Sequence, residues 1–255
     1  MLLAIDAGNS NVTLAVFEGK ELLAHWRLTT DVARTSDEYG SAVRSLFQLA
    51  EIDLRNLQAI VIASVVPALN LTLERMAEAY FKLTPLFVDH NTRTGLKIVY
   101  DQPSDLGADR IVDAAAAVAK YGAPCIVVDF GTATTFNAIN SAGEFVGGAI
   151  SPGLMTCSEA LFSRAAKLPR VEFKQPPGVI GSSTVAAMQA GLYYGYAGLV
   201  DAVLKRMIEE LAATPRVIAT GGLAHTIAPA SQYIGEVDDT LTLEGLRLVY
   251  EQNKV

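Results

Sequence analysis

Short apolar or alternating runs open the chain, and turn residues separate them. The runs cover residues 2–5, 12–17 and 22–28. Gly8-Asn9 and Gly19-Lys20 stand between them, and such pairs are typical of tight turns. The pattern predicts a meander of three antiparallel strands at the start of the chain.

The hydrophobic pattern then changes to helical spacing. Apolar residues recur at intervals of three and four over 36–49 and again over 69–81, with a continuous apolar run at 59–63 between them. The first half of the chain therefore predicts three strands, a helix, a buried strand and a second helix.

The same order returns in the second half of the chain. Strands are predicted at 126–129, 134–140, 144–150 and 216–220, and helices from 153 to about 166, over 183–211 and over 241–250. A helix at 106–120 connects the halves. We therefore expect a duplicated α/β protein with two lobes, 1–115 and 116–255, and an active-site cleft between them. The Pro- and Gly-rich stretch at 167–180 predicts an irregular loop or lid.

Composition limits the function classes. The chain has 255 residues, 51% of them hydrophobic, which is enough for a sizeable core. Its formal charge of −7 opposes broad binding to a nucleic-acid backbone, although backbone amides and a metal ion can still hold a phosphate locally. The start of the chain lacks the features of a signal peptide, and no window has about 18 uncharged apolar residues. We expect a cytoplasmic protein, with no nucleic-acid or membrane partner and with Cys125 and Cys157 as reduced thiols.

Two loops share one pattern. Asp6-Ala-Gly-Asn-Ser10 and Asp129-Phe-Gly-Thr-Ala133 each place an Asp at the end of a predicted strand, a Gly two residues later and a small polar residue after it. The carboxylate suits a hydrated cation, while the glycine and the exposed amides suit phosphate oxygens. A single loop of this kind is more simply an Asx-Gly hairpin turn, but two copies favour nucleotide binding.

The segment Thr220-Gly221-Gly222 has two readings. It follows an apolar strand, where its glycines can admit an adenine or ribose, or it is a simple strand-to-helix turn. The P-loop, the dinucleotide-binding glycine motif and the protein-kinase catalytic loop are all absent from the sequence, which disfavours those mechanisms.

Asp109 and Arg110 fall in the first turn of the predicted connecting helix. There a carboxylate can take a proton from an attacking hydroxyl, and Arg110 or the helix amides can bind an anionic group. The alternative is a structural one, in which Asp109 complements the helix dipole and Arg110 pairs with Asp105 or Asp113. Tyr193, Tyr194 and Tyr196 fit packing or a subunit interface better than a base-stacking platform.

Taken in order, five motifs resemble the type III pantothenate kinases of the actin, Hsp70 and sugar-kinase superfamily. The motifs are Asp6-Ala-Gly-Asn-Ser, Gly107-Ala-Asp-Arg, Asp129-Phe-Gly-Thr-Ala-Thr-Thr-Phe, Gly147-Gly-Ala-Ile-Ser-Pro-Gly and Thr220-Gly-Gly-Leu-Ala. The resemblance spans almost the whole chain. It implies a duplicated two-lobe ribonuclease H-like fold and ATP-dependent phosphorylation of pantothenate to 4'-phosphopantothenate, the first step of coenzyme A biosynthesis.

The resemblance also implies roles for single residues. Asp109 would be the catalytic proton acceptor, and Asp129 would hold a monovalent cation, potassium or ammonium. ATP, with magnesium, would be bound by Asp6, Ala7, Gly8, Asn9, Ser10, Asn11, Val12, Thr13 and Thr132. Pantothenate would be bound by Tyr100, Gly107, Ala108, Asp109, Arg110 and Thr184. The family resemblance further implies a homodimer.

The sequence departs from the family at two positions. Ser10 stands where the family commonly has Thr, which keeps the hydroxyl group. Asn137 stands where it usually has Asp, and the lost charge puts a cation or partner contact there in doubt. Two other functions compete with the pantothenate kinase: a kinase of a sugar or another small alcohol, and a non-catalytic regulator that kept the fold.

Overall fold

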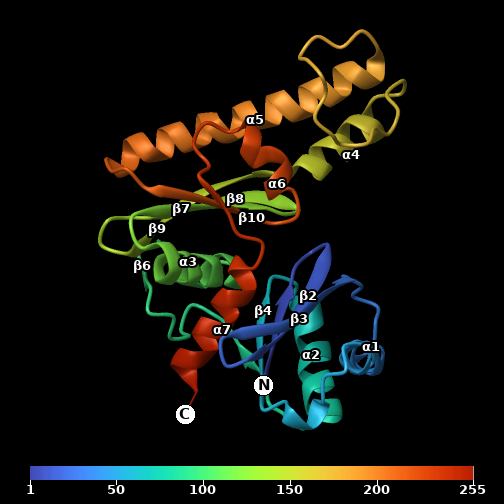
Figure 1. Ribbon diagram of the computed structural model, residues 1–255, viewed down its shortest axis with the longest axis vertical. Coiled ribbons are helices and arrows are strands. Elements are labelled where there is room, and N and C mark those ends of the chain that lie inside the picture. The colour runs from blue at the N-terminus through green and yellow to red at the C-terminus, as the bar shows by residue number, and fades with distance from the viewer. Residues whose placement is uncertain (255) are drawn as a thin grey trace. The chain divides into compact units, whose positions relative to one another are not determined.

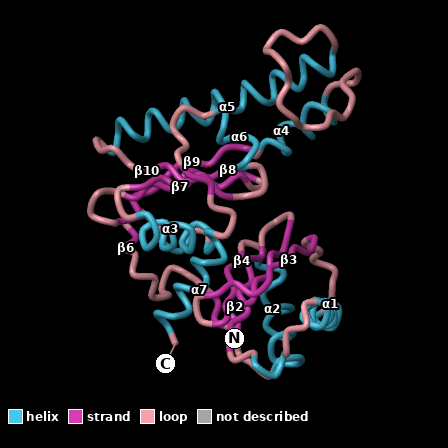
Figure 2. Tube along the Cα trace, in the orientation of Figure 1, coloured by secondary structure: helices cyan, strands magenta, loops and turns pink. Residues whose placement is uncertain are grey.

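In the computed structural model, which describes residues 1–254, the chain forms two compact units. Unit 1 contains residues 1–96, 101–116 and 241–254, and unit 2 contains residues 97–100 and 117–240. Each unit is built around one β-sheet with helices packed on it (Figures 1 and 2).

The sheet of unit 1 has five strands in the order β3-β2-β1-β4-β5. They are β1 (Leu2–Ala7), β2 (Asn11–Glu18), β3 (Glu21–Thr29), β4 (Ala59–Ser64) and β5 (Leu86–Phe87). β1 pairs antiparallel with β2 and parallel with β4, so it lies at the centre. The helices are α1 (Ser36–Leu49), α2 (Pro67–Met76), the first part of α3 (Ala108–Tyr121) and α7 (Leu241–Asn253).

Strand β1 is covered on both faces, which explains its nearly continuous apolar sequence. Leu3 and Ile5 point into a core shared with α1 and α2. The alternate residues Leu2 and Ala4 are also buried, and helix α7 packs against β1, β2 and β4. Since successive side chains of a strand point to opposite faces, a strand between two helical layers has no polar face.

The sheet of unit 2 has the order β11-β10-β7-β8-β9-β6. Its strands are β6 (Lys97–Ile98), β7 (Cys125–Phe130), β8 (Ala133–Ile139), β9 (Glu144–Pro152), β10 (Arg216–Thr220) and β11 (Glu236–Val237). Helices α4 (Leu154–Arg164), α5 (Thr184–Leu211) and α6 (Ala224–Ile227) belong to this unit. The long helix α5 runs along one face of the sheet, where α4 and α6 also lie (Figure 1).

The two sheets repeat one topology, which confirms the predicted duplication. The order β3-β2-β1-β4-β5 of unit 1 matches β9-β8-β7-β10-β11 of unit 2, with the same antiparallel and parallel pairings. The predicted duplicated α/β fold is therefore confirmed. The two-residue strands β5, β6 and β11 were not predicted, because such short pairings carry no periodic pattern.

The ends of some elements differ from the prediction. The helix expected over 69–81 is α2 followed by a π-helical turn at Ala77–Phe81, which ends at Lys82 in the left-handed conformation. The stretch 167–180 contains no helix or strand, as predicted. The expected division at 115/116 lies next to the point where α3 passes from unit 1 into unit 2, but α7 belongs to unit 1 and not to the second unit.

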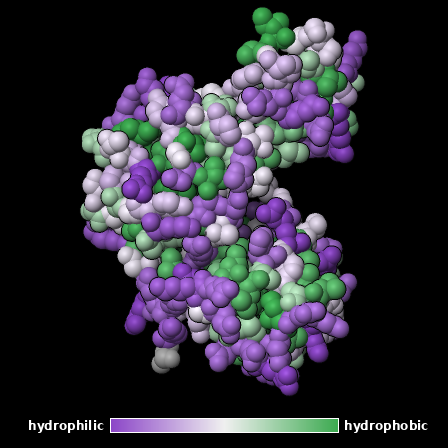
Figure 3. All heavy atoms as spheres, viewed as in Figure 1, coloured by the Kyte–Doolittle hydropathy of each residue, from purple (hydrophilic) through white to green (hydrophobic). Residues whose placement is uncertain are grey.

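Within residues 1–254, no helix combines the length and the apolar composition needed to cross a membrane. The space-filling view shows hydrophilic residues over much of the visible face, with apolar patches between them (Figure 3).

Candidate functional site

The first Asp loop connects β1 to β2 in unit 1. Asp6, near the end of β1, pairs with Thr13 of β2 and with Ala63 of β4. The turn that follows is tight, since the backbone N–H of Gly8 donates to the carbonyl of Asn11 at 3.0 Å. A Cβ atom on Gly8 would lie only 3.2 Å from that carbonyl oxygen, so glycine suits this turn.

Thr30, the residue after β3, is hydrogen-bonded to the same loop. Its hydroxyl donates to the carbonyl of Gly8 at 2.6 Å, and its backbone N–H donates to the carbonyl of Ser10 at 3.0 Å. Asn9, Ser10 and Asn11 remain exposed. The two hydrogen bonds from Thr30 therefore hold the loop, while its polar groups are exposed to solvent, as a phosphate-binding turn requires.

Val65 connects this loop with the Gly-Ala-Asp-Arg segment. Its backbone N–H donates to the carbonyl of Ala7 at 3.1 Å, just past the end of β4. Its Cγ1 atom lies 3.3 Å from the position that a Cβ atom on Gly107 would take. Unit 1 thus brings the end of β1, with Asp6, and the start of α3, with Asp109, to the two sides of one valine.

The carboxylate of Asp109 folds back over the start of α3. Its Oδ1 atom accepts a hydrogen bond from the backbone N–H of Arg110 at 2.7 Å. A Cβ atom on Gly107 would lie 2.5 Å from the same oxygen, so only glycine leaves the carboxylate room in this position. The predicted Gly107-Ala108-Asp109-Arg110 segment is therefore a single packed turn, with Ala108 and Arg110 buried.

Burial raises the pKa of Asp109 above its ordinary value of 3.8. The backbone amides of Arg110 and Asp109 and the charge of Arg110 act in the opposite direction but do not cancel this effect. Loss of water around a carboxylate disfavours its charged form and makes it a stronger base. Asp109 therefore has the property that a general base for an alcohol needs.

The second Asp loop lies in unit 2, at the equivalent place in the repeated topology. Asp129 of β7 pairs with Thr135 of β8 and with Thr220 of β10. Gly221 follows β10 with φ +90°, a conformation that favours glycine. A Cβ atom there would overlap Asp129 Oδ1 and lie 2.7 Å from the backbone nitrogen of Phe130. The strand-to-helix turn therefore closes directly against the Asp129 carboxylate.

Thr132, at the tip of the second loop, is exposed, and its carbonyl is held from α4. That oxygen accepts hydrogen bonds from the backbone N–H of Gly153 at 3.0 Å and from the Thr156 hydroxyl at 2.8 Å. Gly131 closes the turn by donating its N–H to the carbonyl of Ala133 at 3.1 Å. A Cβ atom on Gly153 would overlap the carbonyl oxygens of Gly131 and Thr132.

Tyr196 of α5 supports the base of this loop. Its hydroxyl lies 2.6 Å from Thr134 Oγ1 and donates to the carbonyl of Pro152 at 2.9 Å. Burial raises the pKa of Tyr196 above its ordinary value, so the phenol keeps its proton. Tyr193 is also buried, with its ring 6.1 Å from that of Phe173. Both tyrosines therefore pack in the core of unit 2, which agrees with the packing reading.

The other two predicted pantothenate residues also lie in unit 2. The ring of Tyr100 meets the buried ring of Phe145 edge-on, with the centroids 6.1 Å apart. Thr184 is the exposed first residue of α5, after an N-cap Ser183 whose hydroxyl accepts from the N–H of Ala186 at 3.2 Å. The role of Tyr100 and Thr184 in pantothenate binding stays a prediction.

Asn137 is fully buried in the middle of β8, where it pairs with Val127 and Gly148. Its position, two residues beyond Thr135, places it on the same face of the strand as the residue that pairs with Asp129. The position where the family usually has Asp is therefore buried and uncharged in this chain.

The residues present fit the groups that the motifs imply. Among residues 1–254, no cluster of three or more His, Cys, Asp or Glu side chains forms a ready-made metal centre. Magnesium in phosphotransferases is usually held by one or two carboxylates together with substrate phosphates, so a single carboxylate such as Asp6 suits it. The close turns at Gly8 and Gly131 suit the approach of phosphate oxygens.

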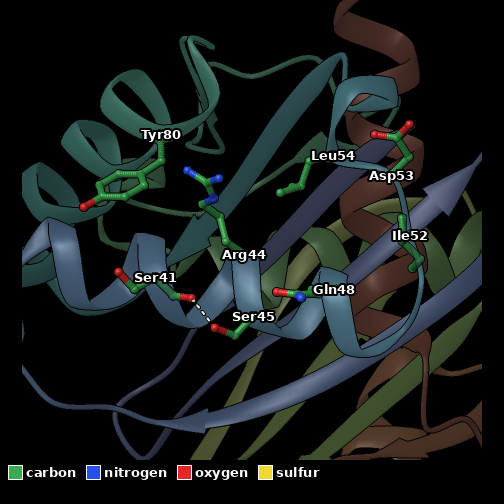
Figure 4. A pocket seen from close by; sticks show the side chains of 8 residues that line it. All are labelled: Ser41, Arg44, Ser45, Gln48, Ile52, Asp53, Leu54 and Tyr80. Carbon is green, nitrogen blue, oxygen red and sulfur yellow. Dashed lines mark hydrogen bonds between the residues drawn. The ribbon is translucent and has the colours of Figure 1, made fainter.

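A surface hollow of about 550 Å³ lies elsewhere in unit 1. Arg44 and Gln48 of α1, Asp53 and Tyr80 are among the side chains around it, and Figure 4 labels all of them. No predicted site residue lines this hollow. We therefore assign it no part in the chemistry.

Besides Thr30, three residues that contact the loops or the Gly107 segment received no role in the sequence analysis: Val65, Gly153 and Thr156. Gly153 ends the Gly147 to Gly153 motif, so its place in that motif was the available signal. Val65 and Thr156 have no such signal in the sequence, because an apolar residue after a strand and a threonine in a helix are common in any protein. Their contacts with Gly107 and Thr132 are long-range and depend on the tertiary structure.

Comparison with known proteins agrees with these motifs. The sequence model of the type III pantothenate kinase family matches residues 2–206. Type III pantothenate kinases from Anaeromyxobacter sp. (strain Fw109-5) and Myxococcus xanthus (strain DK1622) are each 54% identical to this chain, with coverage of 100% of both chains for the first and 99% of both for the second.

Solved structures of lower identity share the fold. The activator of 2-hydroxyisocaproyl-CoA dehydratase from Clostridium difficile, solved with ADPNP, has a TM-score of 0.55 at 10% identity over 98% of this chain and 96% of its own. The inorganic polyphosphate/ATP-glucomannokinase from Arthrobacter sp. strain KM has a TM-score of 0.52 at 14% identity over 99% of both chains. These structures show the fold alone, whereas the family model and the full-length relatives establish that the chain belongs to the type III pantothenate kinase family.

Proposed function

We propose that this protein transfers the γ-phosphoryl group of ATP to the terminal hydroxyl of pantothenate, which yields 4'-phosphopantothenate and ADP, the first step of coenzyme A biosynthesis. The observation that carries the proposal is the Asp109 carboxylate. It is oriented by the N–H of Arg110, accommodated by Gly107 and made more basic by burial.

Asp109 acts as the proton acceptor in this reaction. The pantothenate oxygen attacks the γ-phosphorus while its proton passes to the carboxylate, and the bond from the γ-phosphorus to the β-γ bridging oxygen breaks to release ADP. Phosphoryl transfer depends mainly on positioning and on charge stabilisation, so a single well-placed base is sufficient protein chemistry.

The two Asp loops bind ATP in this proposal. The exposed turn that follows Asp6 and the exposed turn at Gly131 and Thr132 offer amides and hydroxyls to the phosphates. A bound magnesium ion would supply positive charge next to the γ-phosphoryl group. Asp6, which begins the first phosphate loop, would be the carboxylate that holds this ion.

The finer assignments are proposals of the same kind. Asp129 holds a monovalent cation, potassium or ammonium. The pantothenate-binding site is lined by Tyr100, Gly107, Ala108, Asp109, Arg110 and Thr184. In this site the cationic Arg110 faces the pantothenate carboxylate. The protein works in the cytoplasm as a homodimer. The residue assignments, the monovalent cation and the homodimer follow from the family resemblance.

A coupled assay for ADP tests the function. Purified protein is given ATP and magnesium with pantothenate as the only acceptor, in potassium and separately in sodium, and with a hexose as the control acceptor. ADP formation with pantothenate and not with hexose supports the proposal, and dependence on potassium supports the cation assignment. Folded protein that makes no ADP from pantothenate in either salt would overturn it.

A further inference from the structure

The carbonyl oxygen of Thr132 is a meeting point of the second loop and helix α4. It accepts two hydrogen bonds, from the N–H of Gly153 at 3.0 Å and from the Thr156 hydroxyl at 2.8 Å. Gly153 and Thr156 lie at the N-cap and in the first turn of α4, so the loop is tied to a helix of 11 residues instead of ending free in solvent.

The backbone at Gly153, before α4, lies very close to the backbone of the Gly131-Thr132 turn. A Cβ atom on Gly153 would overlap the carbonyl oxygens of Gly131 and Thr132 and would lie 2.8 Å from the carbonyl carbon of Thr132. Gly153 itself follows Pro152, whose carbonyl is bound by the buried hydroxyl of Tyr196. The start of α4 is therefore fixed to the core of unit 2, and it can fix the loop in turn.

We propose that Thr156 is a positioning residue for ATP, which orients the Gly131-Thr132 turn by its hydrogen bond to the Thr132 carbonyl. The inference rests on the proposed function, because it takes Thr132 as an ATP contact. Thr156 does not touch the phosphates in this proposal. Its hydroxyl restricts the motion of the Thr132 peptide group. The loop therefore loses less conformational entropy when ATP binds.

The side chain allows a clean test, because Thr156 is exposed and the core does not depend on it. Thr156→Val keeps the β-branched shape and removes the donor, while Thr156→Ser keeps the donor and removes a methyl group. Ser163→Ala on the same helix is the control, since the Ser163 hydroxyl bonds only weakly to the carbonyl of Ala160 at 3.4 Å.

The experiment measures KM for ATP, KM for pantothenate, kcat and the thermal midpoint of each variant. We expect Thr156→Val to raise KM for ATP about three- to tenfold, the size expected for one neutral hydrogen bond. KM for pantothenate and the thermal midpoint should stay near wild type, and Thr156→Ser and Ser163→Ala should resemble wild type in all four quantities.

Two results would overturn the inference. One is an unchanged KM for ATP in Thr156→Val. The other is a rise in both KM values together with a lower thermal midpoint, which would indicate a purely structural role.

Failure of the proposed function is distinguishable, because the wild type would then make no ADP from pantothenate. In that case ATP binding by wild type and Thr156→Val is compared calorimetrically. Equal affinities, or no ATP binding by the wild type, would end the inference, and weaker binding by the variant would support it.

Discussion

The Oδ1 atom of Asp129 occupies the space that a side chain on Gly221 would need. The two residues are far apart in sequence, but the parallel pairing of β7 with β10 places Asp129 opposite Thr220. The turn after β10 therefore packs directly against the Asp129 carboxylate. Gly221 is needed there for two reasons: a side chain would collide with Asp129, and its φ is +90°.

Gly221→Ala should lower the free energy of unfolding by at least about 2 kcal/mol, because left-handed strain and a collision with Asp129 and Phe130 add together. Gly143→Ala is the matched control, since Gly143 has φ +75° but no heavy atom within 4 Å of an added Cβ atom. Urea unfolding should show that the control loses only about 1 kcal/mol of unfolding free energy. Equal losses in the two variants would mean that the contact with Asp129 contributes nothing.

Gly107→Ala should impair catalysis more than stability. The added Cβ atom would lie 2.5 Å from Asp109 Oδ1, so the carboxylate must turn away from its bond with the N–H of Arg110. We expect kcat to fall about 10- to 100-fold, since a displacement of about 1 Å at the reacting groups can cost that much. Gly178→Ala, in an open loop, should leave kcat unchanged. A normal kcat in Gly107→Ala would argue against this geometry.

Asp109→Asn should reduce kcat by about 10² to 10⁴, the usual contribution of a general base. The wild-type rate should fall as the pH decreases through the Asp109 pKa, which burial places above 3.8, and this acid limb should be missing from the residual activity of the variant. The measurement is kcat/KM against pH. An unchanged rate in the folded variant would remove Asp109 from its role.

The same pKa shift predicts the effect of Asp109→Asn on stability. A carboxyl whose folded-state pKa is raised stabilises the fold while it is protonated, and this contribution is lost as the pH rises through the folded-state pKa. The ionised Asp109 is therefore unfavourable at pH 7, and Asp109→Asn should be at least as stable as wild type there. Below 3.8 the advantage should disappear. Urea midpoints at both pH values test the sign.

Tyr196→Phe should lower the free energy of unfolding by about 1–3 kcal/mol, because the hydroxyl of Thr134, which is fully buried, loses its partner together with the carbonyl of Pro152. The control is Tyr194→Phe, whose hydroxyl bonds the carbonyl of Pro176 at 3.3 Å in a partly exposed place. It should cost less than about 0.5 kcal/mol. A loss in Tyr196→Phe no larger than in the control would contradict the network.

The sequence predicted most of the repeated fold and the two Asp loops. These features depend on near neighbours, since alternating apolar residues with Gly and Asn between them define strands and turns locally. Asp6 and Asp129 were correctly placed at the ends of β1 and β7, because an Asp-x-Gly sequence after an apolar run marks a strand end. Gly107 to Arg110 was likewise placed at the start of a helix.

Only the tertiary structure decided the partners of these elements. The apolar stripe of α7 can cover either sheet, and it packs in unit 1, where Gly245 lets the helix approach the backbone of Val112. In the same way, Gly221 closes on Asp129 and Thr156 holds Thr132, although neither pair is close in sequence. A local pattern specifies an element and its buried face, but the contacts that orient a side chain depend on which elements pack together.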